Sequence, residues 1–108
     1  MHTEQILTQL AELTQTNRKG VDALFEAEEE LAHAENELDA VEARAFLSAE
    51  GSVAERTQQA ELSAAEARLA RDVARAQVTR IKTKLRVIES EIVAQSTMAK
   101  LLAAEARL

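Results

Sequence analysis

The chain has 108 residues, which is enough for one domain. Its composition is 46% hydrophobic, yet it holds only two Phe and no Trp, Tyr, Pro or Cys. Because aromatic side chains normally fill a thick core, this composition argues against a compact globule, and the lack of Cys excludes disulfides and thiolate chemistry. The net charge of −6 argues against a general nucleic-acid binder.

The first arm, residues 3–49, has the heptad pattern of a helix that packs along one seam. Apolar or small residues recur at alternate steps of four and three, with Asn17 as the one strongly polar exception. They are Ile6, Leu10, Leu13, Asn17, Gly20, Leu24, Ala27, Leu31, Ala34, Leu38, Val41 and Ala45. The pattern continues through Gly20 and predicts one unbroken helix, although a break at 17–20 is an alternative.

A turn is expected at 50–52, where a helix stop lies beside a helix start. Gly51 suits the C′ position after a helix, and Ser52 with Glu55 forms an S-x-x-E capping box. So short a connection favours antiparallel neighbours.

The second arm, residues 53–107, repeats the heptad pattern. Its seam positions are Val53, Thr57, Ala60, Ala64, Ala67, Arg71, Ala74, Val78, Ile81, Leu85, Ile88, Ile92, Gln95, Ala99, Leu102 and Ala106. The sequence therefore predicts an all-α fold, a long antiparallel helical hairpin that forms a two-helix coiled coil over the single domain 1–108.

A turn centred near 50–51 also predicts which residues face each other. The expected pairs are Ala27 with Ala74, Ala34 with Ala67, Leu13 with Ile88, and Gly20 with Ile81. Charge supports this arrangement, since residues 21–42 carry nine acids and no Lys or Arg, whereas residues 68–86 carry seven bases and only Asp72. Ion pairs between the arms are expected to help set their register.

Two paired helices with an Ala-rich seam bury little apolar area, so a lone hairpin should be marginally stable. A second apolar stripe supplies a candidate oligomer interface, formed by Val21, Phe25, Leu62, Leu69 and Val73. The expectation is a homo-oligomer, with a dimer that forms a four-helix bundle favoured. The alternative is a monomer with scattered apolar residues on its surface.

Catalytic motifs are absent, and no enzyme activity, cofactor or metal is expected. Glu30 and His33 form an E-x-x-H pair of the kind that helical bundles use for metals. The pair lies outside the seam, and the only other His is His2, so a solvated acidic face is the favoured interpretation.

The basic run 68–86 has two interpretations. It either pairs with the acids of the first arm, which is favoured, or makes weak nucleic-acid contacts through Arg75, Arg80 and Lys82. No apolar run is long enough for a membrane span, and residues 1–5 lack the features of a signal peptide, so we expect a cytoplasmic protein.

Residues 43–56 read A-R-A-F-L-S-A-E-G-S-V-A-E-R. This stretch resembles the hairpin tip of small helical-hairpin proteins of tailed bacteriophages and prophages, which carry a similar A-F-L-x-A-E-G-S/T-V-A-E-R pattern. They are similar also in their acidic first arm and their basic second arm. The resemblance covers specific residues only at the tip. It implies a phage accessory protein and transfers no active site.

Some proteins of that group are encoded beside single-strand annealing recombinases or other early genes. The resemblance thus implies a non-enzymatic accessory protein that acts as an oligomeric coiled-coil binding module with a protein partner, in DNA recombination or replication. One alternative is an anti-defence protein that binds a host factor or sequesters a nucleotide signal. Another is a component of the virion or its assembly.

Overall fold

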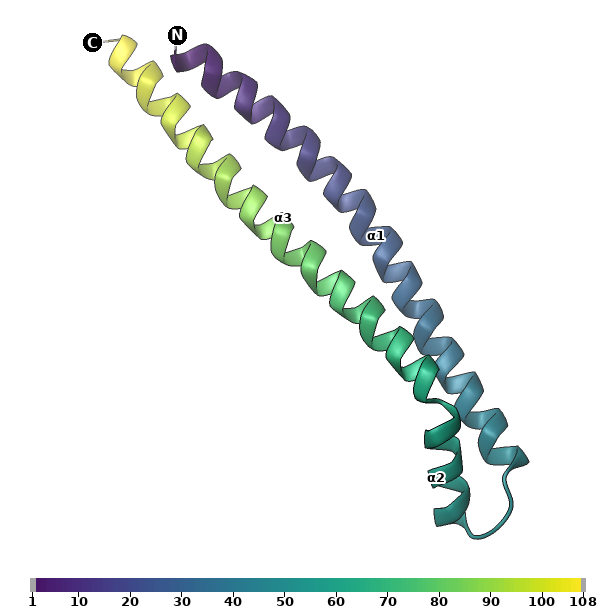
Figure 1. The fold of residues 1–108 in the computed structure, drawn as a ribbon. Coiled ribbons are helices and arrows are strands. Elements are labelled where there is room, and N and C mark those ends of the chain that lie inside the picture. The colour runs from purple at the N-terminus through teal and green to yellow at the C-terminus, as the bar shows by residue number, and fades with distance from the viewer. Residues whose placement is uncertain (1, 108) are drawn as a thin grey trace. The chain divides into compact units, whose positions relative to one another are not determined.

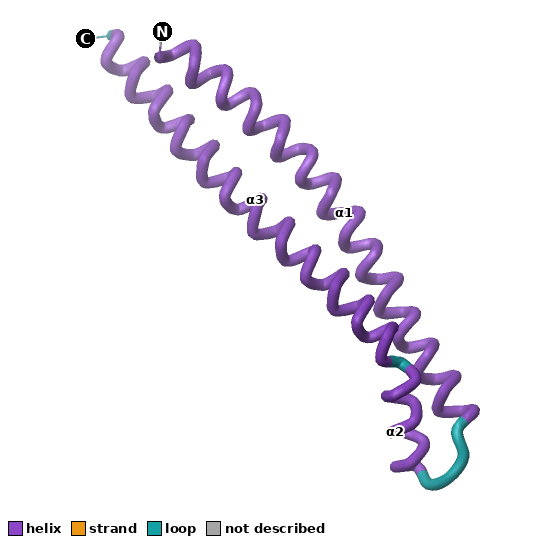
Figure 2. The backbone as a smooth tube through the Cα atoms, viewed as in Figure 1, coloured by secondary structure: helices purple, strands orange, loops and turns teal. Residues whose placement is uncertain are grey.

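The computed structural model describes residues 2–107, which form three helices and no strand. These are α1 (His2–Ser48), α2 (Val53–Ser63) and α3 (Ala65–Ala106). The chain reverses after α1, so that α2 and α3 return antiparallel to it (Figures 1 and 2). The all-α helical hairpin is therefore confirmed. Residues 1 and 108 of the expected domain lie outside the described residues.

The hairpin comprises two compact units, each of which pairs a stretch of the outgoing helix with a stretch of the returning chain. Unit 1 contains residues 1–24 and 80–108, and unit 2 contains residues 25–79 with the turn. Helix α1 is continuous through residues 17–20, so the alternative of a break there is wrong.

The predicted seam is confirmed along most of both arms. Every seam residue from Ile6 to Ala45 and from Ala60 to Leu102 is buried or half-buried. The prediction is wrong at the ends of the second arm, where Val53, Thr57 and Ala106 are exposed. The core is thin, and no large side chain among the described residues is fully buried. Its buried members are Ile6, Ala27, Leu38, Ala60, Ala64, Val78 and Leu85.

The turn uses the predicted residues in a slightly longer connection, 49–52 in place of 50–52. Gly51 has a φ of +109°, a conformation that L side chains rarely adopt. The Ser52 hydroxyl accepts a hydrogen bond of 3.2 Å from the backbone N–H of Glu55. The Glu55 carboxylate lies over Gly51 where a β-carbon would otherwise be. The N-cap is therefore confirmed, and Gly51 is required by both its backbone and its crowded surroundings.

Arg56 joins the start of α2 to the end of α1. Its Nε and Nη2 donate to the Phe46 carbonyl over 3.2 and 3.1 Å, and its guanidinium carbon lies 4.4 Å from the centroid of the Phe46 ring. The last carbonyls of a helix lack partners within the helix and carry partial negative charge. Arg56 therefore serves as a side-chain cap for the C-terminus of α1.

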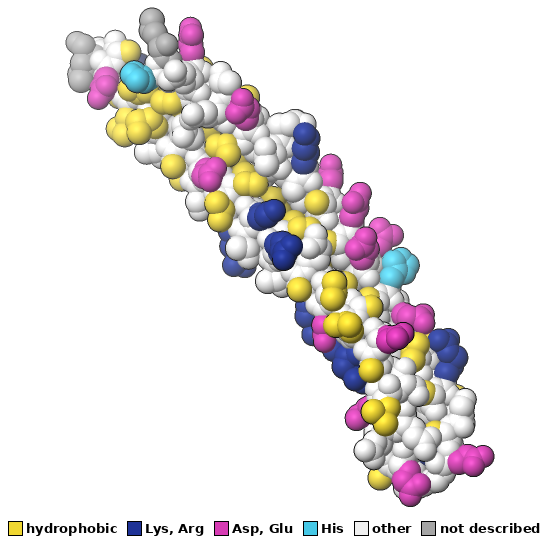
Figure 3. All heavy atoms as spheres, viewed as in Figure 1, with side chains coloured by type: hydrophobic (Ala, Val, Ile, Leu, Met, Phe, Trp, Pro, Cys, Tyr) yellow, Lys and Arg dark blue, Asp and Glu magenta, His cyan; other side chains and the backbone are white. Residues whose placement is uncertain are grey.

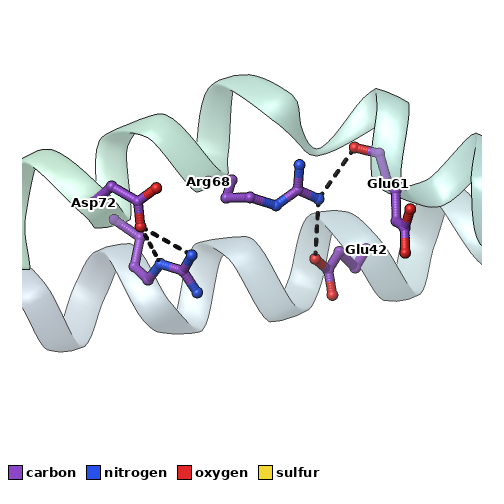
Figure 4. A network of polar contacts seen from close by, with 5 residues as sticks. Glu42, Glu61, Arg68 and Asp72 are labelled. Carbon is purple, nitrogen blue, oxygen red and sulfur yellow. Dashed lines mark hydrogen bonds and ion pairs between the residues drawn. The ribbon is translucent and has the colours of Figure 1, made fainter.

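The second arm is interrupted at Ala64, so the expected single helix over 53–107 is wrong at this residue. Ala64 is fully buried, with φ −93° and ψ 6°, outside the helical range. The hydrogen-bond pattern resumes at once, since Ala64 N–H donates to the Ala60 carbonyl and Arg68 N–H donates to the Ala64 carbonyl. The Arg68 side chain donates to the Glu61 carbonyl over 3.2 Å and contacts the Glu42 carboxylate at 3.7 Å (Figure 4). Arg68 thus satisfies a carbonyl beside the interruption and ties it to α1.

In unit 1, Gly20 identifies the pairing of the two helices. A β-carbon placed on Gly20 would lie 2.6 Å from Cδ2 of Leu85, and no atom of Ile81 lies within 4 Å of it. The expected pairing of Gly20 with Ile81 is therefore wrong. The pairing is displaced by one helical turn, and Leu85 occupies the space that Gly20 leaves.

In unit 2, two ion pairs indicate the register independently. Glu42 lies 3.7 Å from Arg68, and Glu35 lies 3.8 Å from Arg75. With Ala34 opposite Ala67, as expected, Glu42 and Arg68 would be offset by about 13 Å along the axis at 1.5 Å per residue. With Leu38 opposite Ala67 the offset falls to about 7–8 Å, which these side chains can span.

The displaced register has a simple physical reason. In the expected register some seam residues would face polar residues outside the seam, as Leu38 would face Ser63. The register of the structure lets each apolar seam residue face another seam residue, which removes more apolar surface from water.

Candidate functional site: an apolar groove between two charged flanks

Two flanks border the seam, and their charges differ. We call the residues that follow a seam residue by one the ion-pair flank, because Glu42, Arg68, Glu35 and Arg75 all lie there. These side chains are between 37% and 55% exposed, so each pair contributes little, about 0–1 kcal/mol. Their effect is on the register of the arms.

The residues that precede a seam residue by one form the opposite side, which we call the groove flank. In unit 2 this flank and the adjacent seam form an open groove of about 700 Å³. Its lining residues are Glu30, Ala34, Glu66, Leu69, Ala70, Val73, Ala74 and Gln77. Three alanines leave the groove hollow, Leu69 and Val73 make it apolar, and two glutamates border it.

Large apolar side chains are exposed within this groove and on α2. Leu69 and Val73 are 65% and 61% exposed, and Leu62 on α2 is 72% exposed. Figure 3 shows apolar side chains on the surface of α2 and α3. Contiguous exposed apolar patches of this kind are common at interaction surfaces.

The structure separates the five residues of the candidate oligomer interface. Leu69 and Val73 share the groove, whereas Leu62 is exposed on α2 and is not among the residues that line it. Val21 follows the seam residue Gly20 and is half-buried, whereas Phe25 follows Leu24 and is 63% exposed. Val21 and Phe25 therefore lie on the ion-pair flank, away from the groove.

The three candidate phosphate-binding residues are also divided. Arg75 is paired with Glu35 on the ion-pair flank. Arg80 precedes the seam residue Ile81 and Lys82 follows it, so these two cations lie on opposite flanks. They do not form one basic patch.

Arg71 is a charged residue in the seam itself. Its Nε and Nη2 each lie 2.9 Å from Oδ1 of Asp72, and its side chain is 24% exposed. The neighbouring carboxylate therefore draws its charge out of the seam while its apolar stem stays packed. Ala70 and Ala74, which lie near Arg71 in the sequence, line the groove.

A second hollow, of about 740 Å³, lies beside the turn in unit 2. Its lining includes Asp39, Glu42, Phe46, Glu61 and Arg68. Arg68 is already engaged by Glu42 and by the Glu61 carbonyl, so the polar groups here serve the fold.

The described residues include neither a metal-binding cluster nor a membrane-spanning helix. Glu30 and His33 are exposed, and over residues 2–107 no three His, Asp or Glu side chains are grouped to hold a metal ion. No described helix is long and apolar enough to cross a membrane.

Sequence reasoning missed two functional contributions. Arg56 lies within the tip motif, but its bond to a carbonyl ten residues earlier has no spacing signal in the chain. The groove was also missed, because its lining alanines belong to the seam pattern and only the paired structure shows them open on one side.

No protein-family model, curated protein or solved structure matches this chain.

Proposed function

We propose that this chain is a non-enzymatic accessory protein, of the kind carried by tailed bacteriophages, that acts as an oligomeric coiled-coil binding module. The observation that carries the proposal is that several large apolar side chains lie outside the seam while small residues occupy many positions within it. Small residues fill much of the seam, while Leu62, Leu69 and Val73 are more than 60% exposed. Large apolar side chains left in water favour binding to another apolar surface.

Protein contact is favoured over DNA contact. The bases of the second arm are divided between two flanks, and Arg68 and Arg75 are already paired with acids. A DNA-binding surface needs cations gathered on one face. In recombination or replication, the module therefore acts by binding proteins and not by binding DNA.

The test compares three readouts of the purified chain with a Val73→Glu variant. The wild-type chain should self-associate in light scattering and retain its recombination partner in a pull-down from phage-infected cells, and the variant should lose the self-association. Neither should bind single- or double-stranded DNA at low salt. Salt-dependent DNA binding that is abolished by joint charge reversal at Arg75, Arg80 and Lys82 would overturn the preference for protein contact.

A further inference from the structure

The side chains with which α3 lines the groove follow a symmetric order along the helix. They all belong to unit 2, and they are Glu66, Leu69, Ala70, Val73, Ala74 and Gln77. Their positions are symmetric about a point midway between Arg71 and Asp72, so each residue has a counterpart at the same distance on the other side of that point. Each large apolar residue has an alanine as its counterpart, and the acid has an amide.

Such an order suits the binding of the helix to a second copy of itself. Two copies related by a two-fold axis through that point run antiparallel, and each residue lies at the same height along the helix as its counterpart in the other copy. Ala70 is then level with Val73 of the second copy, and Glu66 is level with Gln77. These four residues each precede a seam residue and are spaced by four, three and four, so they form one face, the groove flank of α3 in unit 2.

The sizes of the side chains on this face are complementary. Val73 is 61% exposed, and in the antiparallel pair it would fill the space that Ala70 of the second copy leaves. Leu69 is 65% exposed and lies beside the same face, on the side away from the seam. On that side it comes within about 3 Å, measured along the axis, of the height of Ala76 of the second copy. Large side chains thus meet small ones, as in knobs-into-holes packing.

The charge of Glu66 also favours antiparallel copies. Glu66 is exposed and forms no ion pair among residues 2–107. Antiparallel copies set it against the amide of Gln77, whose N–H groups can donate to a carboxylate. Parallel copies would set Glu66 against Glu66 of the second copy and Ala70 against Ala70, which opposes like charges and leaves a gap next to them.

The exposed area also suits a second copy. The chain exposes 8133 Å². A compact monomer of 11.8 kDa would expose about 5,900 Å². The difference of about 2,200 Å² is more than the roughly 800 Å² per partner that a standard specific interface removes.

We propose that the groove flank of α3 in unit 2 binds the same flank of a second copy of this chain, antiparallel, about a two-fold axis between Arg71 and Asp72. Val73 of each copy enters the hollow beside Ala70 of the other, and Gln77 of each copy donates to Glu66 of the other. This inference rests on the proposed function, because it names the surface through which the module self-associates. The ion-pair flank lies outside this contact.

Single cysteines test the direction of the pairing, because the chain has none of its own. A disulfide needs Cα atoms about 4.4–6.8 Å apart. Antiparallel copies place residue 66 level with residue 77, whereas the two copies of either residue lie about 16 Å apart along the axis. Equal amounts of a Glu66→Cys chain and a Gln77→Cys chain, oxidised with glutathione disulfide, should form the mixed disulfide. Neither chain should form a disulfide with its own kind, and intact-mass spectrometry distinguishes the products.

An Asp72→Cys chain is the matched control for cross-linking. Residue 72 lies next to the proposed axis, so its two copies are at nearly the same height. It follows the seam residue Arg71, however, and therefore lies on the ion-pair flank. This chain should remain unlinked under the same oxidation.

A change of charge tests the same contact through affinity. Gln77→Glu sets an acid against Glu66 at both ends of the pairing and should weaken dimerisation at least about fivefold in sedimentation velocity. The further change Glu66→Lys makes both contacts opposite-charge pairs and should restore the dissociation constant to within about twofold of the wild type. Ala32→Glu adds the same charge on the ion-pair flank and should also stay within about twofold. Far-UV circular dichroism verifies that all variants remain helical.

The outcomes separate this inference from the proposed function. A wild-type dimer whose cysteine chains link to their own kind at residue 66 or 77, or form no mixed disulfide, overturns the inference and leaves self-association intact. A disulfide between Asp72→Cys chains, or equal weakening by Ala32→Glu and Gln77→Glu, also overturns it. A wild-type chain that stays monomeric at high micromolar concentration overturns both.

Discussion

The contact between Gly20 and Leu85 allows a test of the hairpin register, because Gly20→Ala should destabilise the wild-type chain but stabilise a Leu85→Ala variant. Gly20→Ala should gain about 1 kcal/mol of helix propensity. The new β-carbon, however, would lie 2.6 Å from Cδ2 of Leu85, and overpacking of this kind costs about 1–3 kcal/mol. The net effect in the wild-type chain should be destabilisation of up to about 2 kcal/mol.

Leu85→Ala removes the obstructing side chain. Leu85 is only 8% exposed, so this substitution alone should cost about 2–5 kcal/mol. Within the Leu85→Ala background, Gly20→Ala meets no obstruction and keeps its propensity gain. The double variant should therefore be more stable than Leu85→Ala by about 1 kcal/mol.

Urea unfolding followed by circular dichroism at 222 nm, at one chain concentration, measures all four free energies of unfolding. The matched control repeats the cycle with Ile81→Ala, the partner expected from a turn centred at 50–51. An equal effect of Gly20→Ala in the wild-type and Leu85→Ala backgrounds would refute the reasoning. If Gly20→Ala became stabilising in the Ile81→Ala background instead, the result would support the expected pairing of Gly20 with Ile81.

The remaining predictions concern the tip, and each is measured by thermal unfolding. Gly51→Val should destabilise by about 1–3 kcal/mol because φ is +109° and the Glu55 carboxylate occupies the space of a β-carbon, and an unchanged melting temperature would contradict this. Ser52→Ala should cost about 1 kcal/mol through loss of the N-cap, while a cost near zero would remove that role. Arg56→Leu should cost about 1 kcal/mol by uncapping the Phe46 carbonyl, and Arg56→Lys should recover only part of it; full recovery with Lys would show that charge alone matters.

The fold and the seam could be predicted because they depend on local chemistry. Strong helix formers, the heptad steps and the Gly51-Ser52 turn each act within a few residues, and all pointed to one arrangement. Every predicted seam position from Ile6 to Ala45 is buried or half-buried, although Val21, Ala23, Ala40 and Glu42, outside the seam, are half-buried as well. The break at 17–20 did not form, since packing along the seam offsets the poor helix propensity of one glycine.

The register was harder to predict, because the turn alone does not determine it. The expected register also sets every second seam residue of the first arm opposite a seam residue of the second, as Ala27 opposite Ala74, so the match of small with small residues did not reveal the error. The requirement that each large apolar residue face the opposite seam would have excluded the expected register, in which Leu38 faces Ser63. The interruption at Ala64 occurs without a Gly or Pro at this position, and alanine is a strong helix former, so the sequence does not predict it.

The spacing of the second apolar stripe identified residues that the structure leaves exposed, whereas their role as an interface stays a prediction. The exposed residues Leu62, Leu69 and Val73 were identified from their spacing, but the same reasoning included Phe25, which lies on the opposite flank. In an antiparallel pair the flank depends on whether a residue precedes or follows a seam residue, and apolar spacing alone does not separate these two cases.

The central claim is that the chain works through the surface outside its seam, and the mass of the chain in solution tests this most directly. Light scattering of the wild type over rising concentration should give twice the 11.8 kDa chain mass. Val73→Glu, at a position 61% exposed, should remain at the chain mass with the same helix content, whereas Phe25→Glu should match the wild type. A wild-type mass that stays at 11.8 kDa throughout, or a Val73→Glu variant that dimerises as the wild type does, would contradict the account.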